Sequence, residues 1–525
     1  MFNYNKRALL KKLEEQTRYI EKLRRENKEL RAENKDLGAK LAVLEASLEA
    51  RISAAVNEAT APILAELAQK NAELARVNAE LEKANTEIAR LNAIKNKDSS
   101  NSSQPPSQNG FKQIPNNREK SNHKRGGQKG HPGHRLKLPE NLDELIEKGI
   151  VEKKLEDHTN GTEEYVSRWT MDITIKTLIT EHRFPVGQVP PEMYNEVTYG
   201  NGIKGLTVVL SNEGMLSEKR LAELFDNVTQ GVITVSEATI EKFQSEFAGK
   251  LDSELTAIEA DLLNGEVMHT DDTPMKCAQK PEYCEDGKFV LQTAEKKSFK
   301  VYMRTHSNDS STLLTVNPKK DAAGIERDGI LPKYIGILSH DHERKFYNYG
   351  SAHAACGGHP CRELKGLRDL YNIPWAGEIR ALLLEMNDYK NQDLSDGKTA
   401  CDPEDLAKFE QRYDELIKNG QAAVEAMNKG DLGFNKFRLM VKRLYEYKDC
   451  HLLFMRDYKA PFTNNQAERD FRLGKTKQKI SGCFRSWEGI CNYARTRSFI
   501  STLKKRGKNI LSSVALVFKG VPALY

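Results

Sequence analysis

Three acidic side chains lie in local contexts suited to binding divalent cations. Asp271 and Asp341 each end a strand-like apolar run, whereas Glu468 lies at the start of an expected helix. Carboxylates provide the negative charge and the oxygen ligands that Mg²⁺ prefers, while His or Cys would select zinc. Two such ions held about 4 Å apart activate the attacking oxygen and stabilise the leaving oxygen in phosphoryl transfer. The sequence therefore predicts a site for two Mg²⁺ ions, or Mn²⁺, with Asp271 bridging both.

Each of these assignments has a competing interpretation. Asp272 adjoins Asp271, but consecutive strand residues face opposite sides, so we expect only Asp271 to face the site. Glu468 follows Asn464 and Asn465, either of which can cap its helix. Glu468 could instead form an ordinary surface ion pair with a neighbouring arginine, and because the chain has 75 acidic residues the prediction depends on these local contexts.

Basic residues are concentrated in two blocks of a chain whose formal net charge is only +6. Ten Lys or Arg residues stand against two acidic ones from 95 to 138, and twelve against two from 469 to 508. Such blocks favour a polyanion, whose counterions they release, although either block alone can be a solvated face. The expected DNA-binding residues are Lys124, Arg125, Lys129, Arg135, Arg469, Arg472, Lys475, Lys477 and Lys479.

Histidine and cysteine residues near the two aspartates have two interpretations. His353, Cys356 and His359 have ligand types suited to zinc, but the spacing is cramped and we expect a structural role without zinc. Three further histidines either line the metal cleft or form local hydrogen bonds, namely His269, His340 and His342.

Residues 6–94 carry a heptad pattern. Leucines recur every seven residues in both halves, and asparagines such as Asn27 and Asn34 interrupt the seam. In the second half, Asn71, Asn78, Asn85 and Asn92 accompany the leucines. Buried asparagines pair across a parallel dimer and fix its register, so the pattern favours a homodimer formed by a coiled coil over residues 1–95 and interrupted near Pro62. The alternative is an amphipathic helix folded against its own chain.

The rest of the chain divides by composition. Residues 96–136 are polar and basic, which predicts a flexible linker. The order of strands and helices after residue 263 predicts an α/β, ribonuclease-H-like catalytic domain. Other expected parts are a mixed α+β region at 137–200 with strand-like alternation at 173–179, a helical region at 201–262, catalytic segments at 263–362 and 458–505, a helical insertion at 363–457, and a C-terminal tail at 506–525.

Two features of these regions remain open from the residues alone. Segments 216–225 and 236–243 form either a helix-turn-helix, with Ser236 as the N-cap of the second helix, or a plain helical hairpin. Segments 288–291 and 299–303 are expected to pair as a hairpin. The eight cysteines include no C-x-x-C pair, and no run is long enough for export or a membrane span. We therefore expect a cytoplasmic protein, associated with the nucleoid when DNA-bound.

Several motifs together resemble the insertion-sequence-66 family of DDE transposases. Thr270-Asp271-Asp272-Thr273-Pro274 is similar to the family's D-E-T-P motif, with Asp272 in place of Glu, and Ser339-His340-Asp341 corresponds to the second acid. Asn464-Asn465-x-Ala467-Glu468-Arg469 is the most specific match. The remaining similar stretches are Asn101-Ser102-Ser103-Gln104-Pro105-Pro106-Ser107, Gly126-Gly127-Gln128-Lys129-Gly130-His131 and His353-x2-Cys356-x2-His359.

This resemblance implies a transposase that binds terminal inverted repeats, cuts the 3′ ends of its element and joins them to target DNA with Mg²⁺. It also implies accessory proteins from the same element, and the coiled coil would bring two subunits and two DNA ends together. The family's zinc module is not expected, because residues 137–200 contain no cysteine. The alternatives are a catalytically inactive dimeric DNA-binding protein and a nuclease of the same superfamily that does not join strands.

Overall fold

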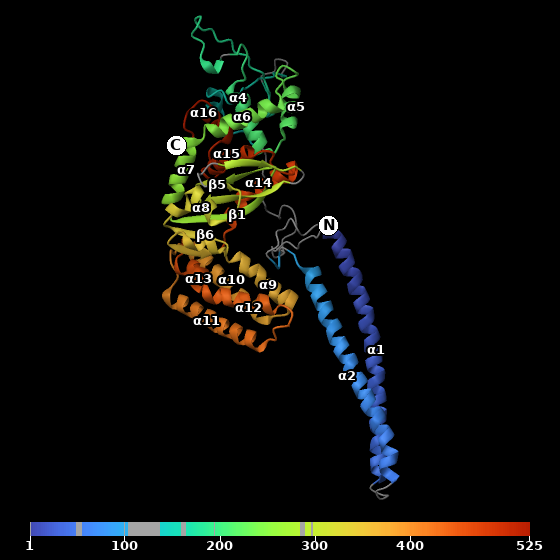
Figure 1. The fold of residues 1–525 in the computed structure, drawn as a ribbon. Coiled ribbons are helices and arrows are strands. Elements are labelled where there is room, and N and C mark those ends of the chain that lie inside the picture. The colour runs from blue at the N-terminus through green and yellow to red at the C-terminus, as the bar shows by residue number, and fades with distance from the viewer. Residues whose placement is uncertain are drawn as a thin grey trace. The chain divides into compact units, whose positions relative to one another are not determined.

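The computed structural model describes residues 2–48, 55–98, 100–102, 137–158, 164–193, 195–283, 289–295 and 298–524. It is a multidomain α/β protein with a helical N-terminal region and a C-terminal region that contains a sheet (Figure 1). Two compact units divide the chain, and the smaller comprises Lys112–Val189 and Leu224–Thr234. No helix in the described ranges is long and apolar enough to cross a membrane.

Helices α1 (Phe2–Leu48) and α2 (Ala55–Asn96) pair with each other within one chain. Their direction is antiparallel, because Tyr19 donates a hydrogen bond of 3.0 Å to Glu80 whereas Glu33 and Lys70 form an ion pair of 2.9 Å. The α1 seam buries residues predicted for it, including Ile20, Leu23, Leu30 and Leu37. This is the arrangement named above as the alternative to a parallel dimer, and dimerisation remains a prediction.

The second half of the heptad prediction needs correction. Asn27 donates a side-chain hydrogen bond to Asn78, but Asn71, Asn85 and Asn92 are exposed. Val77, Ala84 and Leu91 are buried instead, because turning the apolar residues towards α1 leaves the asparagine amides in water. The predicted interruption near Pro62 is also wrong, since α2 runs through that residue.

The region from 137 to 200 contains little regular structure. Helix α3 (Leu142–Glu147) and the short 3₁₀ helix η2 (Pro191–Met193) are its helical elements, and its described residues include no strand. Ile173 and Leu178 are each 86% exposed. The predicted α+β character is therefore wrong here, because the alternating segment 173–179 has no strand partner to satisfy its backbone. Most of the predicted linker, from 103 to 136, lies outside the described residues.

Four helices precede the sheet, namely α4 (Asn201–Asn212), α5 (Glu218–Val228), α6 (Glu237–Gly249) and α7 (Asp252–Asn264). Ser236 caps α6 as expected, its hydroxyl accepting a hydrogen bond of 3.1 Å from the Thr239 amide. Ile240, Phe243 and Phe247 are buried on one face of α6, which packs against α15. A helical hairpin and a helix-turn-helix both require such a buried face, so the packing accords with either interpretation.

A five-stranded mixed sheet forms the centre of the C-terminal region, in the order β5-β4-β1-β6-β7. Strand β4 is antiparallel to both of its neighbours, while β1, β6 and β7 are parallel. The strands of this sheet are β1 (Val267–Cys277), β4 (Phe299–Ser307), β5 (Thr312–Asn317), β6 (Ile337–His340) and β7 (Ala352–Ala355). Side chains of β1 alternate, so that Met268 and Met275 join different apolar clusters on the two faces.

The predicted hairpin between 288–291 and 299–303 is wrong. Strand β3 (Phe289–Thr293) pairs with β2 (Gln279–Tyr283) in a separate two-stranded sheet, and β4 pairs with β1. The apolar residues of β4 are buried, whereas β3 is exposed throughout, so β4 gains more by joining the main core.

Helices after the sheet cover its edge and complete its core. Those that follow the insertion are α14 (Asn465–Ser481), α15 (Trp487–Lys505) and α16 (Ile510–Phe518). Along the edge strand β5, Ser498 and Thr502 of α15 accept hydrogen bonds of 2.8 and 3.0 Å from backbone amides. The predicted C-terminal tail is part of the core, because Val514, Val517 and Phe518 of α16 are buried.

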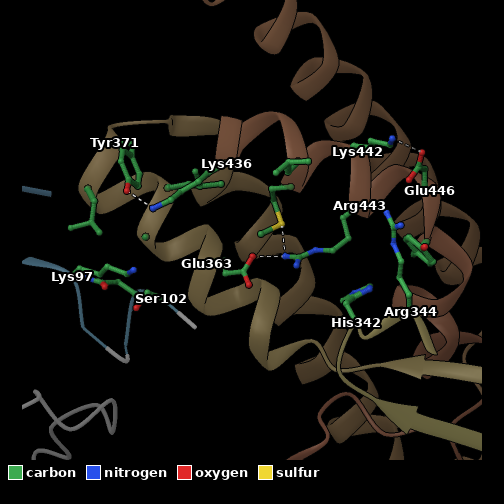
Figure 2. Close-up of a pocket in the computed structure, with 17 residues that line it drawn as sticks. Lys97, Ser102, His342, Arg344, Glu363, Tyr371, Lys436, Lys442, Arg443 and Glu446 are labelled. Carbon is green, nitrogen blue, oxygen red and sulfur yellow. Dashed lines mark hydrogen bonds and ion pairs between the residues drawn. The ribbon is translucent and has the colours of Figure 1, made fainter. Parts of the chain in front are cut away.

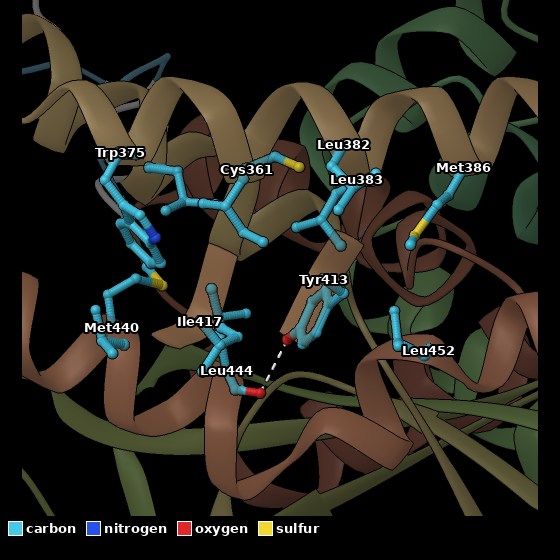
Figure 3. Close-up of a cluster of buried hydrophobic side chains, with 14 of the residues drawn as sticks. Cys361, Trp375, Leu382, Leu383, Met386, Tyr413, Ile417, Met440, Leu444 and Leu452 are labelled. Carbon is cyan, nitrogen blue, oxygen red and sulfur yellow. Dashed lines mark hydrogen bonds between the residues drawn. The ribbon is translucent and has the colours of Figure 1, made fainter. Parts of the chain in front are cut away.

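Helices also fill the region expected as an insertion. They are α9 (Gly358–Tyr371), α10 (Pro374–Ser395), α11 (Pro403–Ala426), α12 (Phe434–Glu446) and α13 (Lys448–Arg456). Their shared core includes Trp375, Ile417 and Leu444, and Tyr413 donates a hydrogen bond of 2.9 Å to the Leu444 carbonyl (Figure 3). Between β5 and β7 lie α8 (Ala322–Asp328), η3 (Leu331–Lys333) and η4 (Arg344–Asn348).

Candidate active site

Asp271 and Asp341 occupy equivalent positions on two neighbouring parallel strands. The register pairs Val267 with Ile337 and His269 with Ser339, an offset that places Asp271 level with Asp341 just beyond the end of β6. Residues level with each other on adjacent strands point to the same face of a sheet. The fold thus brings together two acids that are 70 residues apart.

The charge of Asp341 disfavours ionisation of Asp271. Burial and the neighbouring Asp341 raise the pKa of Asp271 to about 7. The Oδ1 atom of Asp341 is buried and has no hydrogen-bond partner within the described part of the chain. A buried, unpaired carboxylate oxygen beside a second carboxylate is an arrangement that a cation would stabilise.

Asp272 points to the opposite face of β1 and forms a buried ion-pair network. Its Oδ1 lies 2.9 Å from Nε of Arg304, and Lys345 contacts its other oxygen. Arg304 also pairs with Asp328 at 2.6 Å. Strand alternation therefore separates the neighbouring aspartates, leaving Asp271 as the one level with Asp341.

Asn464 joins the start of α14 to the ends of β1 and β6. Its side-chain amide donates a hydrogen bond of 2.8 Å to the Thr270 carbonyl, and its Oδ1 lies 2.9 Å from Nδ1 of His269. Its backbone amide donates to the Cys356 sulfur at 3.2 Å. The expectation that Asn464 caps α14 through its side chain is wrong, because the sheet uses that side chain instead.

Glu468 lies one helical turn after Asn464. Its Oε1 is 3.8 Å from Nη2 of Arg362, which is a cross-element ion pair and not a pair with a neighbouring arginine on its own helix. Two residues later, Asp470 accepts hydrogen bonds of 2.6 Å from Ser307 and 3.1 Å from Thr312. Asn464 and Asp470 thus fix the first turns of α14 on both sides of Glu468.

The donor set fits a divalent cation in part. Asp271 and Asp341 are close enough for their charges to interact, and both provide hard oxygen ligands. Within the described ranges, however, no three His, Cys, Asp or Glu side chains are grouped as ligands of one ion. Asp271 and Asp341 therefore form the core of a cation site, to which Glu468 would be the third contributor.

His353, Cys356 and His359 do not converge. The His353 ring lies 3.2 Å from His340, whereas Cys356 forms a hydrogen bond with His359. Burial opposes ionisation of Cys356, but the hydrogen bond and charge of His359 outweigh it and lower the pKa of the thiol. Cys356 lies against the start of α14, where its sulfur accepts the hydrogen bond of the Asn464 amide, whereas His353 packs against His340 and Tyr347.

The other histidines beside the aspartates form local contacts. His269 bonds Asn464, His340 bonds the Asp341 carbonyl, and His342 lies 2.9 Å from the Tyr347 hydroxyl. Burial lowers the pKa of His340 to about 4 and that of His342 to about 2. These two imidazoles are therefore neutral at pH 7 and contribute no positive charge beside Asp341.

The basic side chains of α14 differ in their accessibility. Arg469, Arg472 and Lys479 are exposed, and Lys475 is half-buried near Asp271. Lys477 was predicted to contact DNA, but it packs 3.4 Å from the Ser211 hydroxyl and over the Tyr493 ring, because its position on the helix faces α4 and α15. Four other predicted DNA-binding residues lie outside the described residues, namely Lys124, Arg125, Lys129 and Arg135.

Sequence reasoning missed two cations near the carboxylates. The first is Lys320. Burial opposes the charge of Lys320, but its pKa is raised by a hydrogen bond to Glu343 and by the charges of Glu343, Asp341 and Asp272. Arg362 reaches Glu468 from α9. Neither residue adjoins a carboxylate motif in the sequence, so a pattern of spacing could not have identified them.

Comparison with known proteins supplies the family. No curated protein and no solved structure matches the chain. Residues 6–137 match DUF6444, a family of unknown function. Residues 196–491 match the transposase IS66 family, and this stretch contains the sheet, the insertion and the three acids. The match covers more than half of the 525 residues and confirms the resemblance identified from the motifs. The chain belongs to the transposase IS66 family.

Proposed function

We propose that this protein is a DNA transposase that cuts the 3′ ends of its element at terminal inverted repeats and joins them to target DNA. Its catalytic residues are Asp271, Asp341 and Glu468. The observation that carries the proposal is the level placement of Asp271 and Asp341 on adjacent parallel strands, where one buried oxygen of Asp341 has no hydrogen-bond partner in the described part of the chain. Buried carboxylate oxygens usually have a hydrogen-bond or ion-pair partner. Because this oxygen of Asp341 has none in the described part of the chain, the geometry favours a cation as its partner.

The sheet supports a ribonuclease-H-like catalytic domain. Its antiparallel strands β4 and β5 lie on one side of β1, and the parallel strands β6 and β7 lie on the other. The first two acids lie on or directly after the two central parallel strands, and the third enters on the helix docked by Asn464. The insertion α9–α13 separates the second acid from the third in sequence.

The three catalytic residues share one role. Asp271, Asp341 and Glu468 would hold two Mg²⁺ ions through their carboxylate oxygens. When bound, these ions would supply Lewis-acid activation of the attacking water or 3′-hydroxyl and would stabilise the leaving oxygen. Asn464 holds Glu468 at the strand ends, and exposed Arg469, Arg472 and Lys479 contact DNA phosphates. The N-terminal segment forms a homodimer that brings two element ends together.

The test measures cleavage and strand transfer on a labelled DNA fragment that carries the element's own ends. Wild type is compared with Glu468→Gln, and the matched control is Glu488→Gln, which makes the same change at an exposed position of α15. We expect Mg²⁺-dependent cleavage and joining in wild type and the control. Glu468→Gln should lose at least a thousandfold in rate while retaining DNA binding.

Other outcomes identify the alternatives. Binding without cleavage in wild type, with accessory proteins of the element present, would indicate a catalytically inactive DNA-binding protein. Cleavage without joining would indicate a nuclease of the same superfamily. Cleavage that survives in Glu468→Gln would show that the third carboxylate is misassigned.

A further inference from the structure

A cavity of about 700 Å³ opens between α9, α12 and the loop that follows β6 (Figure 2). The loop contributes His342 and Arg344, which lie one and three residues after Asp341. Helices α9 and α12 contribute Tyr371 and Lys436, and residues after α2 complete the lining. We call this cavity the α9–α12 pocket. It adjoins the loop that holds the candidate catalytic acid but contains none of the three acids.

The α9–α12 pocket carries excess positive charge. Two of its cations are neutralised, since Arg443 pairs with Glu363 at 2.5 Å and Lys442 pairs with Glu446 at 3.5 Å. Arg344 is exposed, and Lys436 donates a hydrogen bond of 2.5 Å to the Tyr371 hydroxyl. Neither Arg344 nor Lys436 has a carboxylate partner in the described part of the chain. These two cations can therefore bind an anion without first breaking an ion pair.

The walls of the pocket are aromatic and apolar. Leu439 is 55% exposed, and the half-buried rings of Tyr371 and Tyr447 also line the cavity. The ring of Tyr447 lies 4.8 Å from that of Tyr347 in a tilted arrangement and 5.6 Å from that of His342. Rings held in this way have little freedom to lose on binding. Base stacking on an aromatic side chain contributes about 1–3 kcal/mol per base and tolerates any sequence.

The size of the pocket selects among nucleic acids. Cavities of about 300–1,000 Å³ enclose ligands of drug size, comparable to one or two nucleotides. A cavity of about 700 Å³ is too small to enclose a duplex segment as well. Cations at the rim together with aromatic walls are the features that bind single-stranded nucleic acid.

We propose that the α9–α12 pocket binds one or two unpaired nucleotides of a single DNA strand close to the cleaved phosphate. This inference rests on the proposed function, since it concerns DNA held beside Asp341. Arg344 and Lys436 contact phosphates, and Tyr371 and Tyr447 stack on bases. The helical insertion thus holds the DNA strand that has left the duplex. By keeping this strand away from its complement, the insertion positions the strand that is cut.

The test uses the full-length protein and random-sequence oligonucleotides that contain 4-thiothymidine, either single-stranded or annealed as a blunt duplex. Photocrosslinks are mapped to peptides of α9 and α12 in EDTA, so that no cleavage occurs. Arg344→Gln combined with Lys436→Gln removes two cations of the pocket and leaves Lys97, a third cation of its lining, in place. The matched control is Lys418→Gln with Lys429→Gln, which are exposed residues of the same insertion outside the pocket.

We expect the single strand to crosslink to Tyr371 or Tyr447 peptides, and the duplex not to. With about 0.7 counterions released per single-strand contact, removing two contacts lowers apparent affinity at the pocket roughly 10- to 30-fold at 0.1 M salt. The control should remain within about twofold of wild type.

Four results would overturn the proposal. The first two are the absence of crosslinks from α9 and α12 and a crosslink yield for the duplex equal to that for the single strand. The other two are a yield in the double variant equal to that of wild type, and loss of the crosslinks when a mononucleotide competes at the same concentration as the strand. Failure here alongside normal Mg²⁺-dependent cleavage would reject the pocket assignment alone. Pocket crosslinks without any cleavage would reject the proposed catalysis alone.

Discussion

Asp271 and Asp272 are adjacent, yet the structure predicts that removing their charges has opposite effects on stability. The substitutions Asp271→Asn and Asp272→Asn are nearly equal in volume and differ mainly in what the lost charge contacts. Asp271 faces a second carboxylate, whereas Asp272 faces two cations. The sign of each effect therefore reports the face to which each side chain points.

The magnitude for Asp271 follows from its pKa. Burial and the charge of Asp341 raise that pKa from 3.8 to about 7, a difference of roughly three units, and each unit corresponds to about 1.4 kcal/mol. Because the residue is partly exposed, we expect the ionised carboxylate to destabilise the fold by about 2–4 kcal/mol. Because the pKa of Asp271 is raised in the folded state, the stability that its protonated form contributes is fully present below pH 4. It is lost as the pH rises through 7. Asp271→Asn should thus stabilise the sheet at pH 8 and change little at pH 4.

The magnitude for Asp272 follows from its ion pairs. Arg304 is almost fully buried and contacts Asp272 at 2.9 Å, and Lys345 lies against the second oxygen. Removing one partner of a buried pair leaves uncompensated charge and destabilises a protein by about 3–5 kcal/mol. Asp272→Asn should therefore destabilise the sheet at both pH values.

The assay is hydrogen exchange of peptides that cover β1, measured without Mg²⁺ at pH 4 and pH 8 and converted to local opening free energies. This readout isolates the sheet in a multidomain chain whose global unfolding is not two-state. The reasoning is refuted if Asp271→Asn lowers β1 protection at pH 8, or if Asp272→Asn raises it. Equal losses in both variants would mean that Asp271 also has a structural partner.

Three further predictions concern other positions. Asn464→Ala removes the contacts to His269 and Thr270, so β1 and α14 peptides should lose about 2–3 kcal/mol of protection, and cleavage should fall more than binding because Glu468 is no longer held. Leu444→Ala leaves a cavity in the insertion core and should lower the stability of α11 and α12 by about 2–5 kcal/mol in urea unfolding, with β1 exchange unchanged as the internal control. Replacing Asn27 and Asn78 together by Leu substitutes an apolar contact for a polar pair, so the α1–α2 segment should melt at a higher temperature by circular dichroism, and a lower melting temperature would contradict their pairing.

The sequence by itself identified the family, and it predicted strands that end at Asp271 and Asp341. Asp271 and Asp341 end apolar runs that become parallel strands, and the Asn464-to-Arg469 stretch begins a helix, all of which depend on local patterns of burial and capping. The heptads likewise predicted which α1 residues are buried, because a seven-residue period places them on one face whichever helix covers it.

Only the tertiary structure decided which partners those faces meet. The α1 seam meets α2 of the same chain, since an antiparallel pair satisfies the same apolar period as a parallel dimer. The side chain of Asn464 leaves its helix to join two strands, and Lys477 turns inward to α4, although both lie in segments whose sequence predicted a cap and a DNA contact. Local sequence sets the period and conformation of an element, but the rotation of that element against distant neighbours is fixed by packing and hydrogen bonds between residues hundreds of positions apart.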